Sequence, residues 1–151
     1  MSNLDPAQAA RQSRMSLLAK SEPSRLAALF SALADVPAHT WLRTPEVGAV
    51  MVRGRMGGTG APFNLGEMSV TRCALTLPTG EVGHAYVQGR DKDHATRAAL
   101  VDALMQTARS DEVQANVLDP LTEEAVTAKT ARAAKAAATK VEFFTMVRGE
   151  D

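Results

Sequence analysis

The sequence predicts an α+β fold with a mostly antiparallel sheet of about four strands, flanked by N-terminal, central and C-terminal-half helices. Strand-like alternation is concentrated between about residues 47 and 88 and returns at 141–148, whereas helical spacing and capping residues fill the rest. A Pro-Thr-Gly turn signal at 78–80 joins two strand-like runs and predicts a hairpin. Because strands and helices are mixed rather than strictly alternating, we expect α+β and not a parallel sheet.

The chain has 151 residues, which suits one domain over 1–151. We expect an N-terminal helical arm over about 5–36 and the sheet with its helices over about 41–151. Hydrophobic residues make up 45% of the chain but aromatic residues only 4%. The core is therefore expected to be thin, with some apolar surface left for other subunits.

Charge and cysteine content exclude several classes of function. The formal net charge is zero, which argues against non-specific nucleic-acid binding. Cys73 is the one cysteine, so no intramolecular disulfide is possible. We see no signal peptide and no apolar run near the ~20 residues that cross a bilayer. The expectation is a cytoplasmic protein that contacts neither membrane nor nucleic acid.

The N-terminal part predicts two helices. Asp5 is a capping residue and Pro6 suits a first helical position, so the first helix is expected over about 6–20. The second opens by the same logic at residues 21–23 and is expected to end at Val36-Pro37. It carries an amphipathic stripe at i, i+3, i+4 and i+7, which is most simply core packing: Leu26, Leu29, Phe30 and Leu33.

The middle of the chain predicts three strands. A short extended link at 41–45 leads to a first strand over 47–53, and a long glycine-rich connection over 54–66 leads to a second strand over 67–77. The third strand is expected over 81–88.

The second half predicts helices and a last strand. A helix capped by Asp91 or Asp93 is expected to reach about Arg109, followed by a shorter helix or turn over 110–118 that Asp119-Pro120 ends. An alanine- and lysine-rich helix over 121–140 has high propensity but a poor apolar stripe. Residues 141–148 then return to strand.

The glycine-rich connection is the strongest candidate for a site. Glycines let backbone amides approach a ligand, and neighbouring arginines suit an anionic or phosphorylated partner. It is neither a P-loop nor a dinucleotide fingerprint, since no Gly-Lys-Ser/Thr and no helix follows it. A structural loop is the alternative. The candidate phosphate-binding or interface residues are Arg53, Arg55, Gly57, Gly58, Gly60, Arg72, Arg90 and Arg148.

Arg148 belongs to this set because of a short local repeat. Met-Val-Arg-Gly occurs at 51–54 and again at 146–149, each time at the end of a predicted strand. Two such strands side by side would bring Arg53 and Arg148 to one sheet edge; a chance repeat is the alternative.

No catalytic residue is identified from the sequence. The three histidines, His39, His84 and His94, lack metal-ligand spacing, so no metal is expected. Cys73 within a strand is most simply a buried small side chain. No nucleophile and base pair is apparent.

At these residues the chain resembles a known family. Residues 53–68 (RGRMGGTGAPFNLGEM) are similar to the signature of the G subunit of the bacterial carbon–phosphorus lyase core complex, the PhnG family. The same holds for Thr71-Arg72-Cys73, for residues 83–87 (GHAYV) and 89–92 (GRDK), for His94 and for the C-terminal residues 143–151 (FFTMVRGED). The match runs from about Arg43 to the end.

The resemblance implies a subunit in phosphonate catabolism. Proteins of this family assemble with H, I and J subunits. With the L protein, the G, H and I subunits displace adenine from MgATP with a phosphonate, giving α-D-ribose 1-methylphosphonate 5-triphosphate from methylphosphonate. The I subunit is usually taken as the seat of this chemistry. No established catalytic residue can be carried over to this chain from the resemblance, so its catalytic residues stay unknown. The resemblance implies no cofactor bound by this chain alone, with MgATP as a substrate of the assembly.

Three functional hypotheses follow. The chain is an accessory subunit of the phosphonate ribosyl transferase assembly with its loop at a subunit interface, or the loop contributes directly to phosphate binding. A stand-alone anion-binding module is the third.

Overall fold

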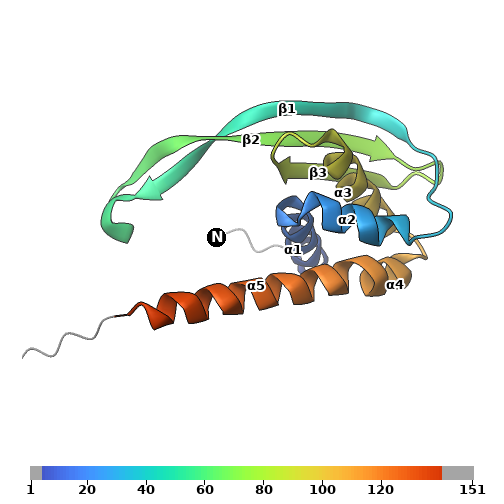
Figure 1. The fold of residues 1–151 in the computed structure, drawn as a ribbon. Helices are drawn as coiled ribbons and strands as arrows, with labels where there is room; N and C mark the ends of the chain where they lie inside the picture. Colours follow the sequence, from blue (N-terminus) through green and yellow to red (C-terminus); the bar gives the residue numbers. More distant parts are fainter. Residues whose placement is uncertain (1–4, 141–151) are drawn as a thin grey trace, which may run out of the picture.

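The computed structural model describes residues 5–140 and shows an antiparallel sheet with helices on one side (Figure 1). Two helices precede the sheet, α1 (Pro6–Lys20) and α2 (Pro23–Ser31). Asp5 caps α1 through its side chain, and each helix carries a proline in its first turn, where a missing N–H costs nothing. The first helix has the predicted bounds, whereas the second ends five residues before Val36.

Three strands make up the sheet within the described residues, in the order β1-β2-β3: β1 (Thr40–Arg55), β2 (Pro62–Thr76) and β3 (Val82–Gln88). Both neighbouring pairs are antiparallel. The turn between β2 and β3 has the predicted hairpin form, with Gly80 at φ 104°. The antiparallel α+β class is therefore confirmed; the predicted fourth strand, 141–148, lies outside the described residues.

The strand predictions around the glycines were wrong in extent. β1 begins at Thr40, so the predicted link at 41–45 is part of the strand, with Pro45 at a register irregularity between Arg43 and Glu46. The predicted long connection is mostly paired strand, because Gly54 and Gly66 occupy ladder positions opposite Phe63 and Val52. Only residues 56–61 connect the strands, and they include the short 3₁₀ helix η1 (Met56–Gly58).

The core lies between the sheet and α3 (Lys92–Leu104), which Asp91 caps. One face of β2 and β3 supplies Cys73, Leu75, Ala85 and Val87. Buried alanine, valine and leucine side chains of α3 pack against them. The small side chains let helix and strand approach closely: a Cβ on Gly83 would stand 2.0 Å from the carbonyl oxygen of Ala99. The thin core predicted from composition is thus closely packed at its centre.

The chain after α3 forms one nearly continuous helical segment. α4 (Ser110–Val113) passes through the π-helical turn η2 (Gln114–Leu118) into α5 (Asp119–Ala138). The prediction that Asp119-Pro120 stops a helix was wrong, because proline in a first turn loses no hydrogen bond and here begins α5. The prediction that the third helix reaches Arg109 was also too long, since α3 ends at Leu104.

Candidate functional site: a hairpin arm opposite an exposed helix

The β1–β2 hairpin extends well beyond the third strand. Pairing between β2 and β3 stops at Val70–Gln88, whereas β1 and β2 stay paired out to Arg55 and Pro62. We call residues 49–69 the hairpin arm; its β2 half is about 25 Å long at ~3.3 Å per residue. Figure 1 shows the arm curving away from the sheet on the same side as the free end of α5. An isolated two-stranded ribbon is marginally stable in water, so the arm is a candidate for contact with another molecule.

The arm exposes large apolar side chains. Met56 is 77% exposed and Leu65 67% exposed, and Met51 and Phe63 are each more than two-fifths exposed. Among residues 5–140 no third strand covers either edge of the ribbon there. Backbone edges and apolar side chains left open in this way are typical of a surface that another chain covers.

The glycines of the tip are explained by the turn itself. Gly57 and Gly58 have φ of 60° and 81°, a region that side-chain-bearing residues adopt at a cost. A Cβ on Gly60 would stand 2.7 Å from the carbonyl oxygen of Met56, which accepts the hydrogen bond from the Gly60 amide at 2.9 Å. Arg55 Nη1 donates to the Gly60 carbonyl oxygen at 3.0 Å and closes the turn.

The four predicted arginines within the described residues do not meet at one point. Arg53 and Arg55 lie at the tip of the arm, both exposed. Arg53 pairs across the ladder with Asn64, eight residues before Arg72 on β2, which is about 26 Å along a strand. Arg90 lies between these positions, with its Nε 3.4 Å from Ser69 Oγ. Arg148 lies outside the described residues.

Arg72 belongs to an ion-pair cluster on the sheet. Its Nε donates to Glu46 Oε1 at 2.6 Å, and Arg43 Nη1 donates to the same oxygen at 2.6 Å. The hydrogen bond from Arg43, followed by that from Arg72, lowers the pKa of the Glu46 carboxyl below its ordinary value. With its charge shared in this way, Arg72 is less available to an outside anion than Arg53, which has no ion pair or hydrogen bond to any side chain among residues 5–140.

Helix α5 is the second projecting element. Leu121 is its buried side chain, and residues 122–138 are exposed along their whole length. The exposed part carries Glu123 and Glu124 near its start, and after Ala125 its charged residues up to Ala138 are all basic: Lys129, Arg132 and Lys135. A helix exposed all round draws little stability from packing and depends on propensity, which its alanines supply.

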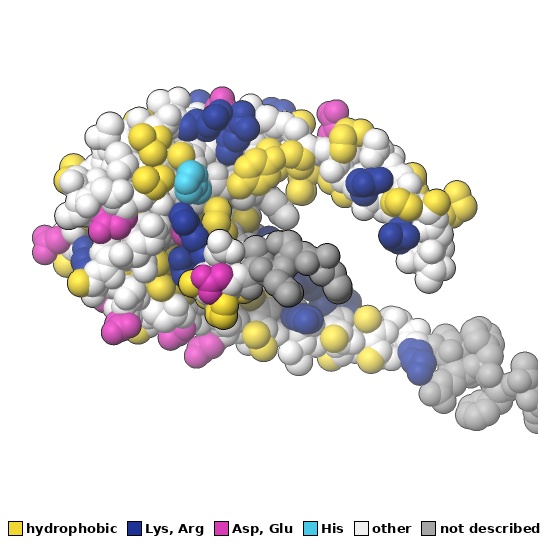
Figure 2. Space-filling model, turned by 180° about the vertical axis from the view of Figure 1, so that it is seen from behind, with side chains coloured by type: hydrophobic (Ala, Val, Ile, Leu, Met, Phe, Trp, Pro, Cys, Tyr) yellow, Lys and Arg dark blue, Asp and Glu magenta, His cyan; other side chains and the backbone are white. Residues whose placement is uncertain are grey.

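Figure 2 shows open space between the hairpin arm and the far part of α5, with dark-blue Lys and Arg side chains on both. The arm carries Arg53 and Arg55 against a single carboxylate, Glu67. Carboxylates and basic residues are equal in number in the whole chain, so both projecting elements are more basic than the chain average. We call the space between them the hollow.

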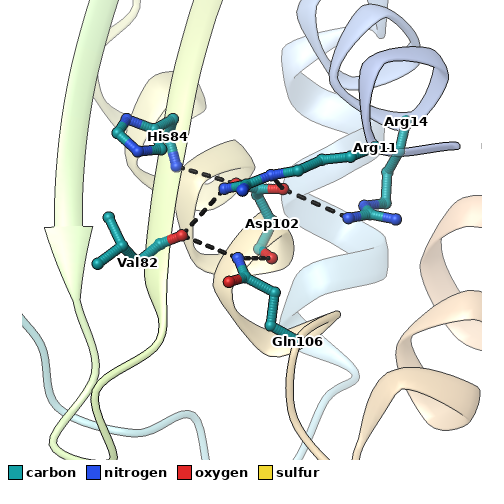
Figure 3. A network of polar contacts seen from close by, with 6 residues as sticks. All are labelled: Arg11, Arg14, Val82, His84, Asp102 and Gln106. Atoms are coloured by element: carbon teal, nitrogen blue, oxygen red, sulfur yellow. Dashed lines mark hydrogen bonds and ion pairs between the residues drawn. The ribbon is translucent and has the colours of Figure 1, made fainter. Parts of the chain in front are cut away.

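A buried polar network, not predicted from the sequence, fixes α1 to the sheet (Figure 3). Asp102 on α3 is fully buried and accepts two hydrogen bonds from Arg11, from Nε at 3.1 Å and from Nη2 at 2.6 Å. The backbone N–H of His84 donates to the same carboxylate at 3.0 Å, and Arg14 Nη2 stands 3.5 Å from it. The hydrogen bond to Asp102 raises the pKa of the Arg11 guanidinium.

This network also satisfies the free edge of β3. Val82 is an edge residue whose carbonyl oxygen accepts from Arg11 Nη2 at 3.0 Å and from Gln106 Nε2 at 2.8 Å. Within the described residues 5–140, β3 has no partner strand on this edge, and these side chains take its place and block edge-to-edge pairing there. The sequence signal for it was Asp102, the one carboxylate within the otherwise apolar residues 98–104 of α3.

Cys73 and His94 have structural positions. Cys73 is buried, its Sγ donates to the Ala95 carbonyl oxygen at 3.3 Å, and burial raises the pKa of the thiol to about 11. His94 is also buried and its Nε2 lies 2.9 Å from the Leu18 carbonyl oxygen, where it donates. The interpretation of Cys73 as a small core side chain is confirmed.

In residues 5–140 no group of three or more histidine, cysteine, aspartate or glutamate side chains is placed to hold a metal ion. No helix in the same part of the chain is long and apolar enough to cross a membrane.

Comparison with known proteins decides the family. The model of the family described as "Phosphonate metabolism protein PhnG" matches residues 9–149. The chain belongs to the PhnG family. This PhnG-family chain is also 45% identical over 148 residues to a protein of Rhizobium meliloti (strain 1021) named "Alpha-D-ribose 1-methylphosphonate 5-triphosphate synthase subunit PhnG". The alignment covers 97% of this chain and 94% of that relative. The family resemblance found at the glycine motif is thereby confirmed and extends over the N-terminal helices as well.

Proposed function

We propose that this chain is a subunit of an α-D-ribose 1-methylphosphonate 5-triphosphate synthase and acts only within that assembly. Support comes from the relative of that name, which matches along nearly the whole of both chains at 45% identity. The alignment covers 94% of that relative, so the comparison extends over nearly all of it.

The observation that carries the subunit role is the surface left open by the fold. The hairpin arm and residues 122–138 of α5 project from the packed body and bury almost nothing against it. Keeping a two-stranded ribbon and an uncovered helix ordered costs conformational entropy that packing against residues 5–140 does not offset. Burial against neighbouring subunits supplies the missing stabilisation.

The partners of this assembly are H, I and J subunits, joined by the L protein for activity. In the cytoplasm the assembly would displace adenine from MgATP with a phosphonate. The role of this chain is to build and position the complex, because its buried cysteine and His94 are held by backbone partners and are not presented to a substrate.

The test is adenine release from ATP and methylphosphonate. We expect none from the purified chain, none from the H, I, J and L proteins without it, and release when all five are combined. Turnover by this chain alone would contradict the proposal, and so would full activity in its absence.

A second role, direct phosphate binding by the arm, is favoured by one observation: Arg53 is exposed at the tip with no ion pair among residues 5–140. Arg53→Glu should then weaken nucleotide binding by the assembled complex while the subunits stay together. Loss of assembly in this variant would indicate that the tip contacts a partner subunit and does not bind phosphate.

A further inference from the structure

The surface of α5 that faces the hollow can be read from its helical register. Leu121 is buried against the body, and Ala125 and Ala128, four and seven residues on, line a cavity of about 490 Å³ shared with α1 and the link that follows it. Arg132 and Lys135 follow at positions eleven and fourteen, so they continue the same stripe. One face of α5 therefore contacts the body near the start of the helix. Farther along the helix, the same face presents the two basic side chains to the hollow.

These side chains have no counter-charge on the described chain. Within residues 5–140 neither Arg132 nor Lys135 makes an ion pair or a hydrogen bond through its side chain, and no carboxylate occurs on α5 after Glu124. Glu124 itself is paired with Arg25, at 2.7 Å. On the opposite side of the hollow the arm adds Arg53 and Arg55 against one acid.

We propose that the hollow receives an acidic segment of a partner subunit, whose carboxylates pair with Arg132 and Lys135 on α5 while its apolar residues cover the arm. This inference rests on the proposed function. It adds where on this chain a partner subunit binds and that the binding segment is negatively charged. Complementary charge would steer the partner into the hollow, and the exposed apolar side chains of the arm, Leu65 and Met56 above all, would provide the buried area. The alanines that surround the basic stripe leave room for a partner backbone to approach α5 closely.

The first experiment is binding of this chain to tagged H, I and J subunits. Arg132→Glu should raise the dissociation constant about tenfold, and Lys135→Glu should do the same, because each places a carboxylate opposite a carboxylate. Lys92→Glu is the matched control: it makes the same charge change at an exposed position on the body and should bind like the unmodified chain. Raising the salt concentration should weaken subunit binding by the unmodified chain more than subunit binding by the Arg132→Glu variant.

The second experiment locates the contact without a mutation. A carbodiimide joins a lysine amine directly to a carboxylate, so treatment of the assembled complex should link Lys135 to an aspartate or glutamate of a partner subunit. Links from Lys135 only to carboxylates of residues 141–151 of this chain would overturn the proposal, since the chain's own C-terminal residues would then be the occupant.

The outcomes separate this inference from the proposed function. If the unmodified chain binds the three subunits but Arg132→Glu and Lys135→Glu bind equally well, the acidic-segment proposal fails and the subunit role stands. If the unmodified chain does not bind them at all, the proposed function itself fails.

Discussion

Arg11 and Asp102 form a bidentate ion pair between α1 and α3, with donor–acceptor distances of 3.1 and 2.6 Å. The carboxylate is fully buried and also accepts from the His84 amide. Since these residues are 91 positions apart, the pair ties the N-terminal helix to the core of the sheet domain.

Asp102→Ala should therefore be severely destabilising. It leaves the His84 amide without its acceptor and the Arg11 guanidinium with only the Val82 carbonyl oxygen, and breaking one side of a buried pair costs about 3–5 kcal/mol. Urea unfolding of the variant should show a free energy of unfolding lower by that amount, whereas Asp93→Ala, at an exposed site on the same helix, should change it by less than about 0.5 kcal/mol. An unchanged midpoint for Asp102→Ala would show that the network is not a stabilising link.

Gly83 is expected to be intolerant of any side chain. A Cβ would lie 2.0 Å from the Ala99 carbonyl oxygen and 2.9 Å from the Ala103 Cβ, so β3 and α3 must move apart. Overpacking of this kind costs about 1–3 kcal/mol, so Gly83→Ala should lower the free energy of unfolding by at least this amount. Gly48→Ala is the control, because a Cβ there meets nothing within 4 Å. Equal stability of the two variants would refute the close approach of strand and helix.

The turn at the tip of the arm makes a separate prediction. Gly57 has φ of 60°, so Gly57→Ala is strained by about 1 kcal/mol, while asparagine tolerates this region better. The amide of Gly60, whose hydrogen bond to Met56 closes the turn, should exchange its hydrogen about fivefold faster in Gly57→Ala. In Gly57→Asn the rate should stay near that of the unmodified chain, and a reversed order of the two variants would contradict the left-handed turn.

Because the Cys73 thiol is buried, we expect the chain to lose stability at alkaline pH. Burial raises the pKa of its thiol from an ordinary value near 9.0 to about 11, so the unfolded chain loses this proton before the folded chain does. The contribution of the protonated thiol to the free energy of unfolding is fully present below pH 9. It is lost as the pH rises towards 11, a change of about 2–3 kcal/mol. The difference in unfolding free energy between the unmodified chain and Cys73→Ala, measured from pH 8 to 11, should narrow over that window. A constant difference would show that the thiol ionises freely in the folded state.

Local signals predicted where the first three helices begin, but α2 and α3 each end about five residues earlier than predicted. Asp5 with Pro6 and Asp91 before α3 act as caps, because capping depends on neighbouring backbone groups alone. The Pro-Thr-Gly turn between β2 and β3 is local in the same sense. Proline was misread once, at Pro120, since a first-turn proline and a helix-ending proline look alike in sequence.

Long-range pairing could not be predicted in the same way. Gly54 and Gly66 interrupt the strand pattern, yet each is held in the ladder by the residue opposite, Phe63 and Val52. The Asp102 network depends on Arg11 and Arg14, which lie about 90 residues away on another helix. The site prediction identified the tip arginines but gave no indication that α5 would project beside them.

The central claim is that the hairpin arm and the exposed part of α5 are covered by other subunits. Hydrogen–deuterium exchange of the free chain and of the chain bound to H, I and J subunits tests it directly. We predict that amides of residues 62–68 and 126–138 exchange more slowly in the assembly, while those of α3 are unchanged. Assembly with no change in exchange at either projecting element would contradict the account.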